Sequence, residues 1–148
     1  MPSGCFIDTN LLLYLQDRTA TEKAKRVAEL LGALADHDLI VVNTQVLKEY
    51  THNILRKFRD VSYDQLLAEL EAMRPWCRAP LDFHTALRGL ALHRRHRFSF
   101  YDACLVASAL DYGCEMFLSE DLNHHQKIEG MRIINPFADD PRGHIQRN

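Results

Sequence analysis

The stretch Cys5-Phe6-Ile7-Asp8-Thr9-Asn10 places three apolar residues directly before three polar ones, near the beginning of a 148-residue chain. A short apolar run that stops at turn-forming polar residues is typical of a buried strand that ends in a loop. Similar runs occupy residues 39–42, 116–118 and 131–134. The sequence therefore predicts four short buried strands, each followed by polar residues.

Helical patterns separate these runs. Val27, Leu30, Leu31 and Leu34 recur at the spacing of one helix face, which predicts an amphipathic helix over residues 19–35. Further helices are expected over residues 10–15, 44–58, 62–73, 82–91 and 100–112, with Thr44, Ser62 and Asp82 as N-caps and Gly113 ending the last. Residues 74–80 are expected to form a loop or a short edge strand, and residues 93–99 a basic connector.

Strands that alternate with helices predict an α/β fold. We expect a three-layer sandwich whose central, mostly parallel sheet is covered by helices on both faces. We expect a single domain over residues 1–137, followed by a polar, frayed tail over residues 138–148.

Composition excludes several classes of protein. Hydrophobic residues make up 47% of the chain and charged residues 26%, which argues against disorder. No apolar run approaches the ~18 residues of a membrane span, and no signal peptide is expected. Four cysteines without a CxxC pair point to a reducing cytoplasm. A net charge of −2 argues against nucleic-acid binding by bulk charge, although six arginines and one acid lie between residues 74 and 101.

Four acidic residues lie where such a fold binds ligands. Ligands of parallel sheets bind beyond the carboxyl ends of the strands, which selects Asp8 and Asp121. Glu49 lies in the helix that follows the second predicted strand, and Asp102 lies at the beginning of the most apolar helix. Helices that leave from strand ends place their N-termini on the same rim, so we expect the four carboxylates to converge.

Converging carboxylates need a counter-charge. Two of them ~4 Å apart repel by about 4 kcal/mol at an effective dielectric constant of 20. A set of oxygen ligands favours Mg²⁺ or Mn²⁺ over Zn²⁺. Two such ions about 3.5–4 Å apart can stabilise the attacking and leaving oxygens of a phosphodiester. The residues therefore favour metal-dependent phosphodiester hydrolysis.

The segments that carry these acids resemble a known family. Phe6 to Asn10, Phe98 to Ala103, Leu118 to Leu122 and Ile134 to Phe137, together with Glu49, look like a PIN-domain nuclease, most closely a VapC-type toxin ribonuclease. The resemblance extends over residues 6–137. It implies an endoribonuclease dependent on Mg²⁺ or Mn²⁺ that leaves 5′-phosphate and 3′-hydroxyl ends. It also implies a homodimer and a cognate antitoxin that blocks the acidic site.

The resemblance also implies a role for each site residue. The catalytic acids are Asp8, Glu49, Asp102 and Asp121; Asp8, Asp102 and Asp121 hold metal, and Glu49 completes the cluster directly or through water. Thr9, Asn10 and Ser119 support them. The sequence departs from the family at Asn123, where many members carry another acid. An asparagine carbonyl binds an ion more weakly, which puts a second metal site in doubt.

Other interpretations of the same residues remain open. Asp8 to Asn10 suit a helix cap, and Ser99 with Asp102 fits a capping box. Glu49 suits a solvated helix face, and Glu120 is an alternative ligand to Asp121. At the level of function, the alternatives are a non-catalytic PIN-like binding module and a phosphohydrolase with Asp8 as nucleophile. The phosphohydrolase usually needs a second acid where Asn10 stands.

Two further groups of residues, four arginines and a pair of histidines, are candidates for a binding function. Arg88, Arg94, Arg95 and Arg97 are candidates for gripping an RNA backbone, although arginines also suit the solvated C-terminal end of a helix. The pair His124-His125 suggests zinc, but no Cys or His lies at ligand spacing nearby. The sequence contains no glycine-rich phosphate loop and no nucleophile elbow.

Overall fold

A computed structural model describes residues 4–144. A five-stranded sheet has the order β2-β1-β3-β5-β4. Its strands are β1 (Cys5–Ile7), β2 (Ile40–Val41), β3 (Met116–Leu118), β4 (Lys127–Ile128) and β5 (Met131–Ile134). Every pairing is parallel except that of β4 with β5. The expected mostly parallel sheet is therefore confirmed.

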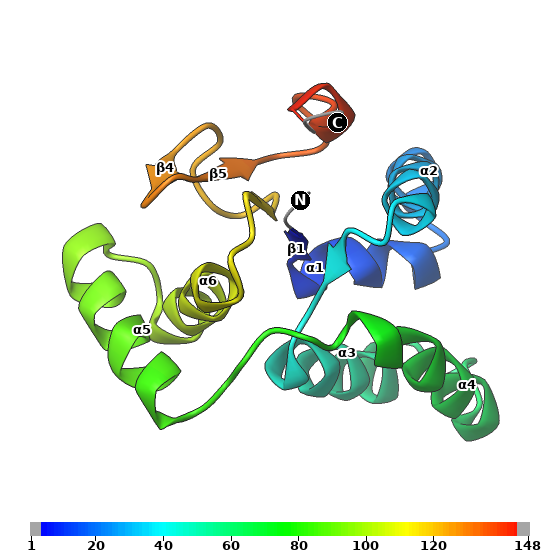
Figure 1. Ribbon diagram of the computed structural model, residues 1–148. Helices are drawn as coiled ribbons and strands as arrows, with labels where there is room; N and C mark the ends of the chain where they lie inside the picture. Colours follow the sequence, from blue (N-terminus) through cyan, green and yellow to red (C-terminus); the bar gives the residue numbers. More distant parts are fainter. Residues whose placement is uncertain (1–3, 145–148) are drawn as a thin grey trace.

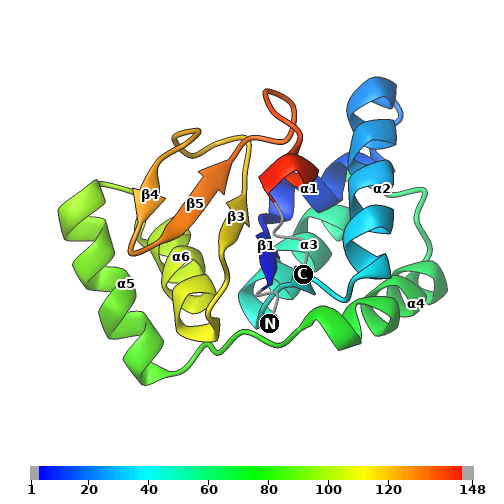
Figure 2. The same cartoon turned by 45° about the horizontal axis from the view of Figure 1, so that its top comes forward.

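Six α-helices flank the sheet. They are α1 (Thr9–Leu13), α2 (Thr21–Asp36), α3 (Thr44–Lys57), α4 (Tyr63–Met73), α5 (Phe83–His96) and α6 (Phe100–Tyr112). Helices α5 and α6 lie on the left of Figure 1, and α1 to α4 lie on the right. Figure 2 shows β1, β3, β5 and β4 side by side between the two groups. This arrangement is the expected α/β sandwich.

The core is formed where the strands meet the apolar helix faces. Every residue of β1 and β3 is buried, and the rings of Phe6 and Phe117 stack at 5.1 Å in paired positions of these strands. Helix α6 has seven buried residues, as its nearly uniform apolar sequence predicts. It ends at Gly113, whose φ of 95° suits glycine best. The sheet and α6 together form a rigid base for the loops beyond the strands.

Local signals placed most helix ends correctly. Ser62 and Gln65 form the expected capping box, and Asp82 accepts a hydrogen bond from the Thr85 N–H at the N-terminus of α5. Thr44 was expected to cap α3, but Asn43 does so by accepting from the Val46 N–H at 3.0 Å. Asn43, not Thr44, is the residue with extended backbone just before the first helical turn, and a side chain at that position can accept from the N–H groups of the turn.

Three other expectations need correction. Helix α5 continues through His96, so most of the predicted basic connector is its last turn. Strand β4 was not foreseen; it pairs with β5 through the turn at Glu129 and Gly130. Residues 141–144 form a 3₁₀ turn within the tail predicted to fray, and residues 145–148 of that tail lie outside the described residues.

No helix among residues 4–144 is long and apolar enough to cross a membrane.

Candidate active site

The register of the parallel strands brings two polar residues, Asp8 and Ser119, to one edge of the sheet. Ile7 is level with Leu118, and Leu118 with Ile134. The chain therefore leaves the sheet at neighbouring points, and the Asp8 N–H donates to the Leu118 carbonyl at 3.0 Å. The Ser119 N–H donates to the Ile134 carbonyl in the same way, also at 3.0 Å. Asp8 and Ser119 are thus fixed side by side by backbone pairing.

Asp8 lies at the centre of this edge and is 6% exposed. Its Oδ1 accepts from the Thr9 N–H at 2.8 Å, which caps α1, and its Oδ2 accepts from the Ser119 hydroxyl at 2.8 Å. Ser119 Oγ in turn accepts from the N–H groups of Asp121 and Leu122. Helix capping, one of the two interpretations of Asp8, is confirmed, but capping leaves the carboxylate within the acidic site.

Glu49 reaches the same edge from α3. Its Oε2 accepts from the Thr9 hydroxyl at 2.7 Å, and its Oε1 accepts from Gln45 Nε2 at 3.0 Å. Gln45 Nε2 also lies 3.1 Å from the carbonyl oxygen of Tyr101, which ties α3 to the first turn of α6. Gln45 was not identified from the sequence, because its role depends on a carbonyl that only folding brings near.

Asp102 and Asp121 complete the group. Asp102 lies in the first turn of α6, where its N–H donates to Ser99 Oγ at 3.2 Å. Asp121 is exposed, and its Oδ2 accepts from the side-chain amide of Asn10 in α1. Asn10 and Thr9 therefore hold carboxylates that come from two distant parts of the chain.

The pKa values of Asp8 and Asp102 reflect the carboxylates near them. The pKa of Asp8 is raised from 3.8 to about 7 by burial, with Asp102 and Asp121 adding to the rise and the Ser119 hydrogen bond opposing it. Burial also raises the pKa of Asp102; Glu49 and Asp121 reinforce the rise, and Ser99 opposes it. The four carboxylates thus form one electrostatic cluster, as the strand-end rule predicted.

Within the part of the chain that the structure describes, no lysine, arginine or histidine pairs with this cluster. Among residues 4–144, none of the ion pairs involves Asp8, Glu49, Asp102 or Asp121. Their hydrogen-bond donors are all neutral: backbone N–H groups, hydroxyls and amides. Like charges held close together without a counter-ion are unfavourable unless the site binds a cation.

The donor set fits a hard divalent ion. All four side chains offer oxygen, which suits Mg²⁺ or Mn²⁺. In the described residues, no three of these carboxylates gather their oxygens within 4.8 Å of one another. Mg²⁺ keeps several waters and is usually bound by one or two carboxylates, so a spread arrangement is compatible with ligation through water.

Glu120 does not belong to the cluster. Its carboxylate accepts from Lys23 Nζ and from the Tyr14 hydroxyl, each at 2.6 Å. Burial alone would raise the pKa of Glu120, but these two partners outweigh it and lower that pKa. Of the two neighbouring acids, only Asp121 faces the site. The Asn123 side chain is exposed and its amide donates to Gln126 at 3.2 Å; among the described residues it forms no hydrogen bond with the four acids.

A third possible metal ligand, which the sequence did not reveal, lies beside the pair His124-His125. Ligand atoms of His124, His125 and Asp139 lie within 4.8 Å of one another. However, His124 Nδ1 accepts from the Asn135 N–H at 2.9 Å, so the neutral ring carries its proton on Nε2. Asp139 Oδ2 lies 2.7 Å from His144 Nε2. Two of the three groups therefore already have hydrogen-bond partners outside the trio, which favours a structural role over zinc binding.

The candidate RNA-binding arginines separate into two kinds. Arg88 forms ion pairs with Asp111 and with Glu129 and is half-buried, so it joins α5 to α6 and to the β4–β5 turn. Arg94, Arg95 and Arg97 are exposed at the C-terminal end of α5. We therefore keep only the last three as candidates for phosphate contacts.

Comparison with known proteins agrees with this geometry. The family model described as PIN domain matches residues 5–129. A solved structure, "Toxin-antitoxin complex from Klebsiella pneumoniae", is similar with a TM-score of 0.66 and 18% sequence identity, covering 90% of this chain and 98% of that chain. No curated protein matches the chain. The match over most of the sequence shows that the chain belongs to the PIN domain family.

Proposed function

We propose that the protein is a metal-dependent endoribonuclease and the toxin of a toxin–antitoxin pair. The proposal is carried by the four carboxylates, which share one edge of the sheet and have only neutral hydrogen-bond partners among the described residues. Membership of the PIN domain family, whose members are generally nucleases, supports it. The solved toxin–antitoxin complex of similar fold supports the second half of the proposal.

Each residue of the site has a distinct task in this proposal. Asp8, Asp102 and Asp121 would hold Mg²⁺ or Mn²⁺, and Glu49 would complete the site directly or through water. When bound, the metal supplies an activated water and charge stabilisation at the phosphodiester. Thr9 orients Glu49, Ser119 orients Asp8, and Asn10 orients Asp121, through the hydrogen bonds that they donate.

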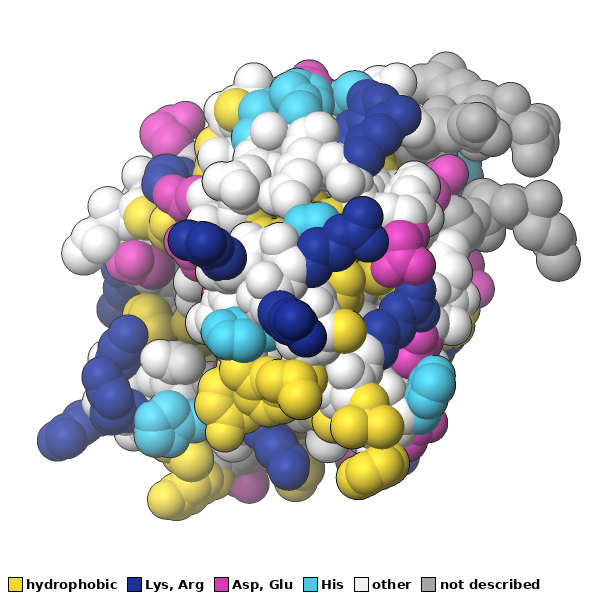
Figure 3. Space-filling model, turned by 90° about the vertical axis from the view of Figure 1, so that its left-hand side faces the viewer, with side chains coloured by type: hydrophobic (Ala, Val, Ile, Leu, Met, Phe, Trp, Pro, Cys, Tyr) yellow, Lys and Arg dark blue, Asp and Glu magenta, His cyan; other side chains and the backbone are white. Residues whose placement is uncertain are grey.

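Exposed arginines would bind the substrate backbone. Arg94 and Arg95 lie in the last turn of α5, and Arg97 directly follows that helix. Figure 3 views the side of the molecule on which α5 lies and shows Lys and Arg side chains around a hydrophobic patch. Phosphate contacts of this kind strengthen binding without selecting a sequence.

The hydrophobic patch supports a protein partner. Phe83, Leu87 and Leu90 are exposed on α5 to 80%, 52% and 55%. Large exposed apolar side chains that gather on one face suit a protein contact. A homodimer or an antitoxin complex, both implied by the family resemblance, would use such a surface. Sedimentation of the pure chain, beside a Leu87→Glu variant, tests the homodimer.

The alternatives are distinguished by the same site. A phosphohydrolase with Asp8 as nucleophile usually needs a second acid two residues on, but that residue is Asn10, whose amide donates to Asp121. A binding module without catalysis would not need uncompensated acids. The geometry therefore favours the nuclease over both.

The decisive experiment is RNA cleavage with Mn²⁺ or Mg²⁺ against EDTA, beside an Asp8→Asn variant. We expect cleavage that requires metal and is lost in the variant. Calorimetry on the same sample provides an independent measure of ion binding. If the protein neither cleaves RNA nor binds the ions, the nuclease proposal is refuted and the binding module is favoured. Activity on a phosphomonoester but not on RNA would favour the phosphohydrolase.

A further inference from the structure

Glu120 stands between two residues of the acidic site, yet it is held on the opposite side of the loop. Ser119 bonds Asp8, and Asp121 bonds Asn10. Glu120 instead accepts from Lys23 Nζ through Oε1 and from the Tyr14 hydroxyl through Oε2. Three consecutive side chains are therefore fixed in three different ways, and the middle one has the only cation.

Contacts with two aromatic residues, Tyr14 and Phe137, hold Lys23 in place. Its Nζ lies 3.3 Å from the Tyr14 hydroxyl oxygen and 5.0 and 4.9 Å from the ring centroids of Tyr14 and Phe137. These two rings pack edge to face at 5.5 Å. An ammonium group over two aromatic rings gains cation–π attraction in addition to its ion pair. These contacts fix the position of Lys23 and, through the ion pair, that of Glu120.

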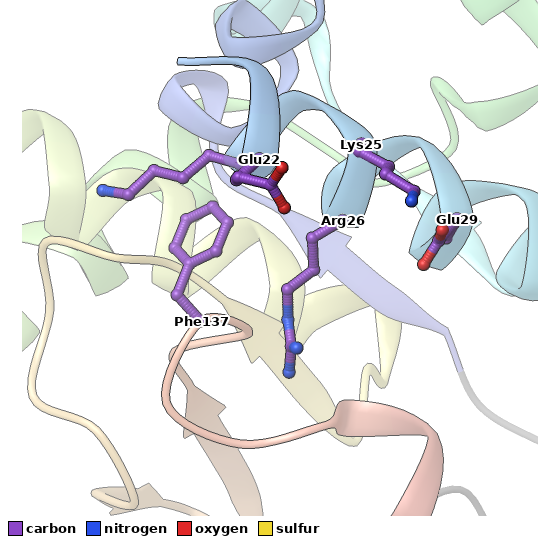
Figure 4. Close-up of a pocket in the computed structure, with 6 residues that line it drawn as sticks. Glu22, Lys25, Arg26, Glu29 and Phe137 are labelled. Carbon is purple, nitrogen blue, oxygen red and sulfur yellow. The ribbon is translucent and has the colours of Figure 1, made fainter.

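Helix α2 also holds the chain where it leaves β5. Arg26 Nε donates to the Pro136 carbonyl at 2.6 Å. Figure 4 shows Phe137 opposite α2, with Arg26 extending toward the segment after β5. Lys23, Arg26 and Phe137 line a hollow of about 330 Å³ at this junction. One face of α2 thus braces the exits of both β3 and β5.

We propose that Lys23 is a positioning residue of the acidic site. By holding Glu120, it determines that Asp121, and not its neighbour, presents a carboxylate to the divalent cation. Without Lys23, Glu120 would be free to turn toward the cluster, where its charge would repel Asp121 and displace that carboxylate from the Asn10 amide. The inference rests on the proposed function, because it assigns Asp121 to metal binding.

Solvent exposure separates this role from a purely structural one. The side chains of Lys23 and Glu120 are 42% and 26% exposed. An ion pair that exposed contributes little to folding stability. Loss of Lys23 should therefore leave the melting temperature almost unchanged and should act on metal binding instead.

The test is Mn²⁺ titration calorimetry on the full chain, with the melting temperature measured in parallel. Lys23→Met should bind Mn²⁺ about 10-fold more weakly, the lower end of what partners of metal ligands typically contribute. Lys23→Arg should keep the affinity of the unchanged protein. Lys25→Met is the matched control, since Lys25 is exposed on the same helix and lines the same hollow.

A second variant tests whether Lys23 acts through Glu120. In Lys23→Met combined with Glu120→Gln, the competing charge is gone, so Mn²⁺ affinity should return to within about 3-fold of the unchanged protein. An unchanged or tighter affinity in Lys23→Met would overturn the inference, as would a double variant no better than the single. If the unchanged protein binds no Mn²⁺, the proposed function itself fails.

Discussion

Replacing Asp8 with asparagine should stabilise the metal-free protein at neutral pH, although Asp8 is a proposed metal ligand. Asp8 is 6% exposed, and burial, opposed by Ser119 and reinforced by Asp102 and Asp121, raises its pKa from 3.8 to about 7. A carboxyl group whose pKa is raised by folding destabilises the folded state at every pH above the pKa that it has in the unfolded chain. Asparagine has the same shape and no charge, so it avoids that penalty.

The magnitude follows from the pKa difference. A rise of roughly 3 units corresponds to about 4 kcal/mol at 1.36 kcal/mol per unit, which is an upper bound. The asparagine oxygen keeps the bond from the Thr9 N–H, and its amide can donate to Ser119 Oγ. The Ser119 hydroxyl then loses its acceptor, which costs part of the gain. We expect a net gain of about 2 kcal/mol, or a rise of about 4–8 °C in melting temperature.

The effect should depend on pH in a defined direction. Below the unfolded pKa of 3.8, Asp8 is protonated in both states and contributes nothing. Between 3.8 and about 7, the unfolded chain releases its proton first, so the stability of the unchanged protein falls as pH rises. Above about 7, both states are ionised and the penalty is constant. The advantage of Asp8→Asn should therefore be larger at pH 8 than at pH 5.

Urea denaturation and scanning calorimetry in EDTA measure this difference. Asp36→Asn is the matched control, because Asp36 is exposed at the end of α2 and its substitution should change stability by no more than about 0.5 kcal/mol. Saturating Mn²⁺ should reverse the order, since an ion at 100 times its Kd adds about 2.7 kcal/mol to the unchanged protein alone. A variant less stable than the unchanged protein in EDTA at pH 8, or a difference independent of pH, would refute the reasoning.

Three further predictions concern other parts of the molecule. Ser119→Ala removes the hydroxyl that donates to the buried Asp8 carboxylate; it should lower the free energy of unfolding by about 1–3 kcal/mol in urea denaturation and weaken Mn²⁺ binding in calorimetry. Gly89→Ala should lower the free energy of unfolding by about 1–3 kcal/mol, because the added Cβ would lie 3.1 Å from the backbone of α6. Gly32 faces open space, so Gly32→Ala should raise the free energy of unfolding by about 0.5–1 kcal/mol. Thermal melts of the two variants test both expectations. Arg94→Gln with Arg95→Gln should raise the KM for RNA and flatten its salt dependence at unchanged kcat, and an unchanged salt slope would exclude them from substrate binding.

Much of the fold followed from local signals. The apolar runs gave β1, β2, β3 and β5, because short buried strands of a parallel sheet have no polar face. Strand β4 escaped notice, since two residues carry no period and its pairing depends on β5. The last turn of α5 was missed because four consecutive basic residues, His93–His96, resemble a loop. A helix C-terminus favours such residues through its dipole.

The acidic site was predictable to the extent that it depends on strand ends. Asp8 follows β1 directly, Asp121 lies three residues after the end of β3, and the register between these strands brings both to one edge. Roles that depend on distant partners were not predictable. Gln45 acts through Glu49 and the Tyr101 carbonyl, and Arg88 is neutralised by two acids from α6 and the β4–β5 turn.

The choice between Glu120 and Asp121 shows why a sequence alone leaves such a site open. Both acids are adjacent in one loop, so spacing cannot separate them. Folding supplies Lys23 to Glu120, whose charge is then compensated, whereas Asp121 receives only the neutral amide of Asn10. The same contrast sets the four acids of the cluster apart from Asp111, which pairs with Arg88. Within the described residues, the four acids of the cluster have only neutral donors, and like charges held close together without a counter-charge favour the binding of a cation.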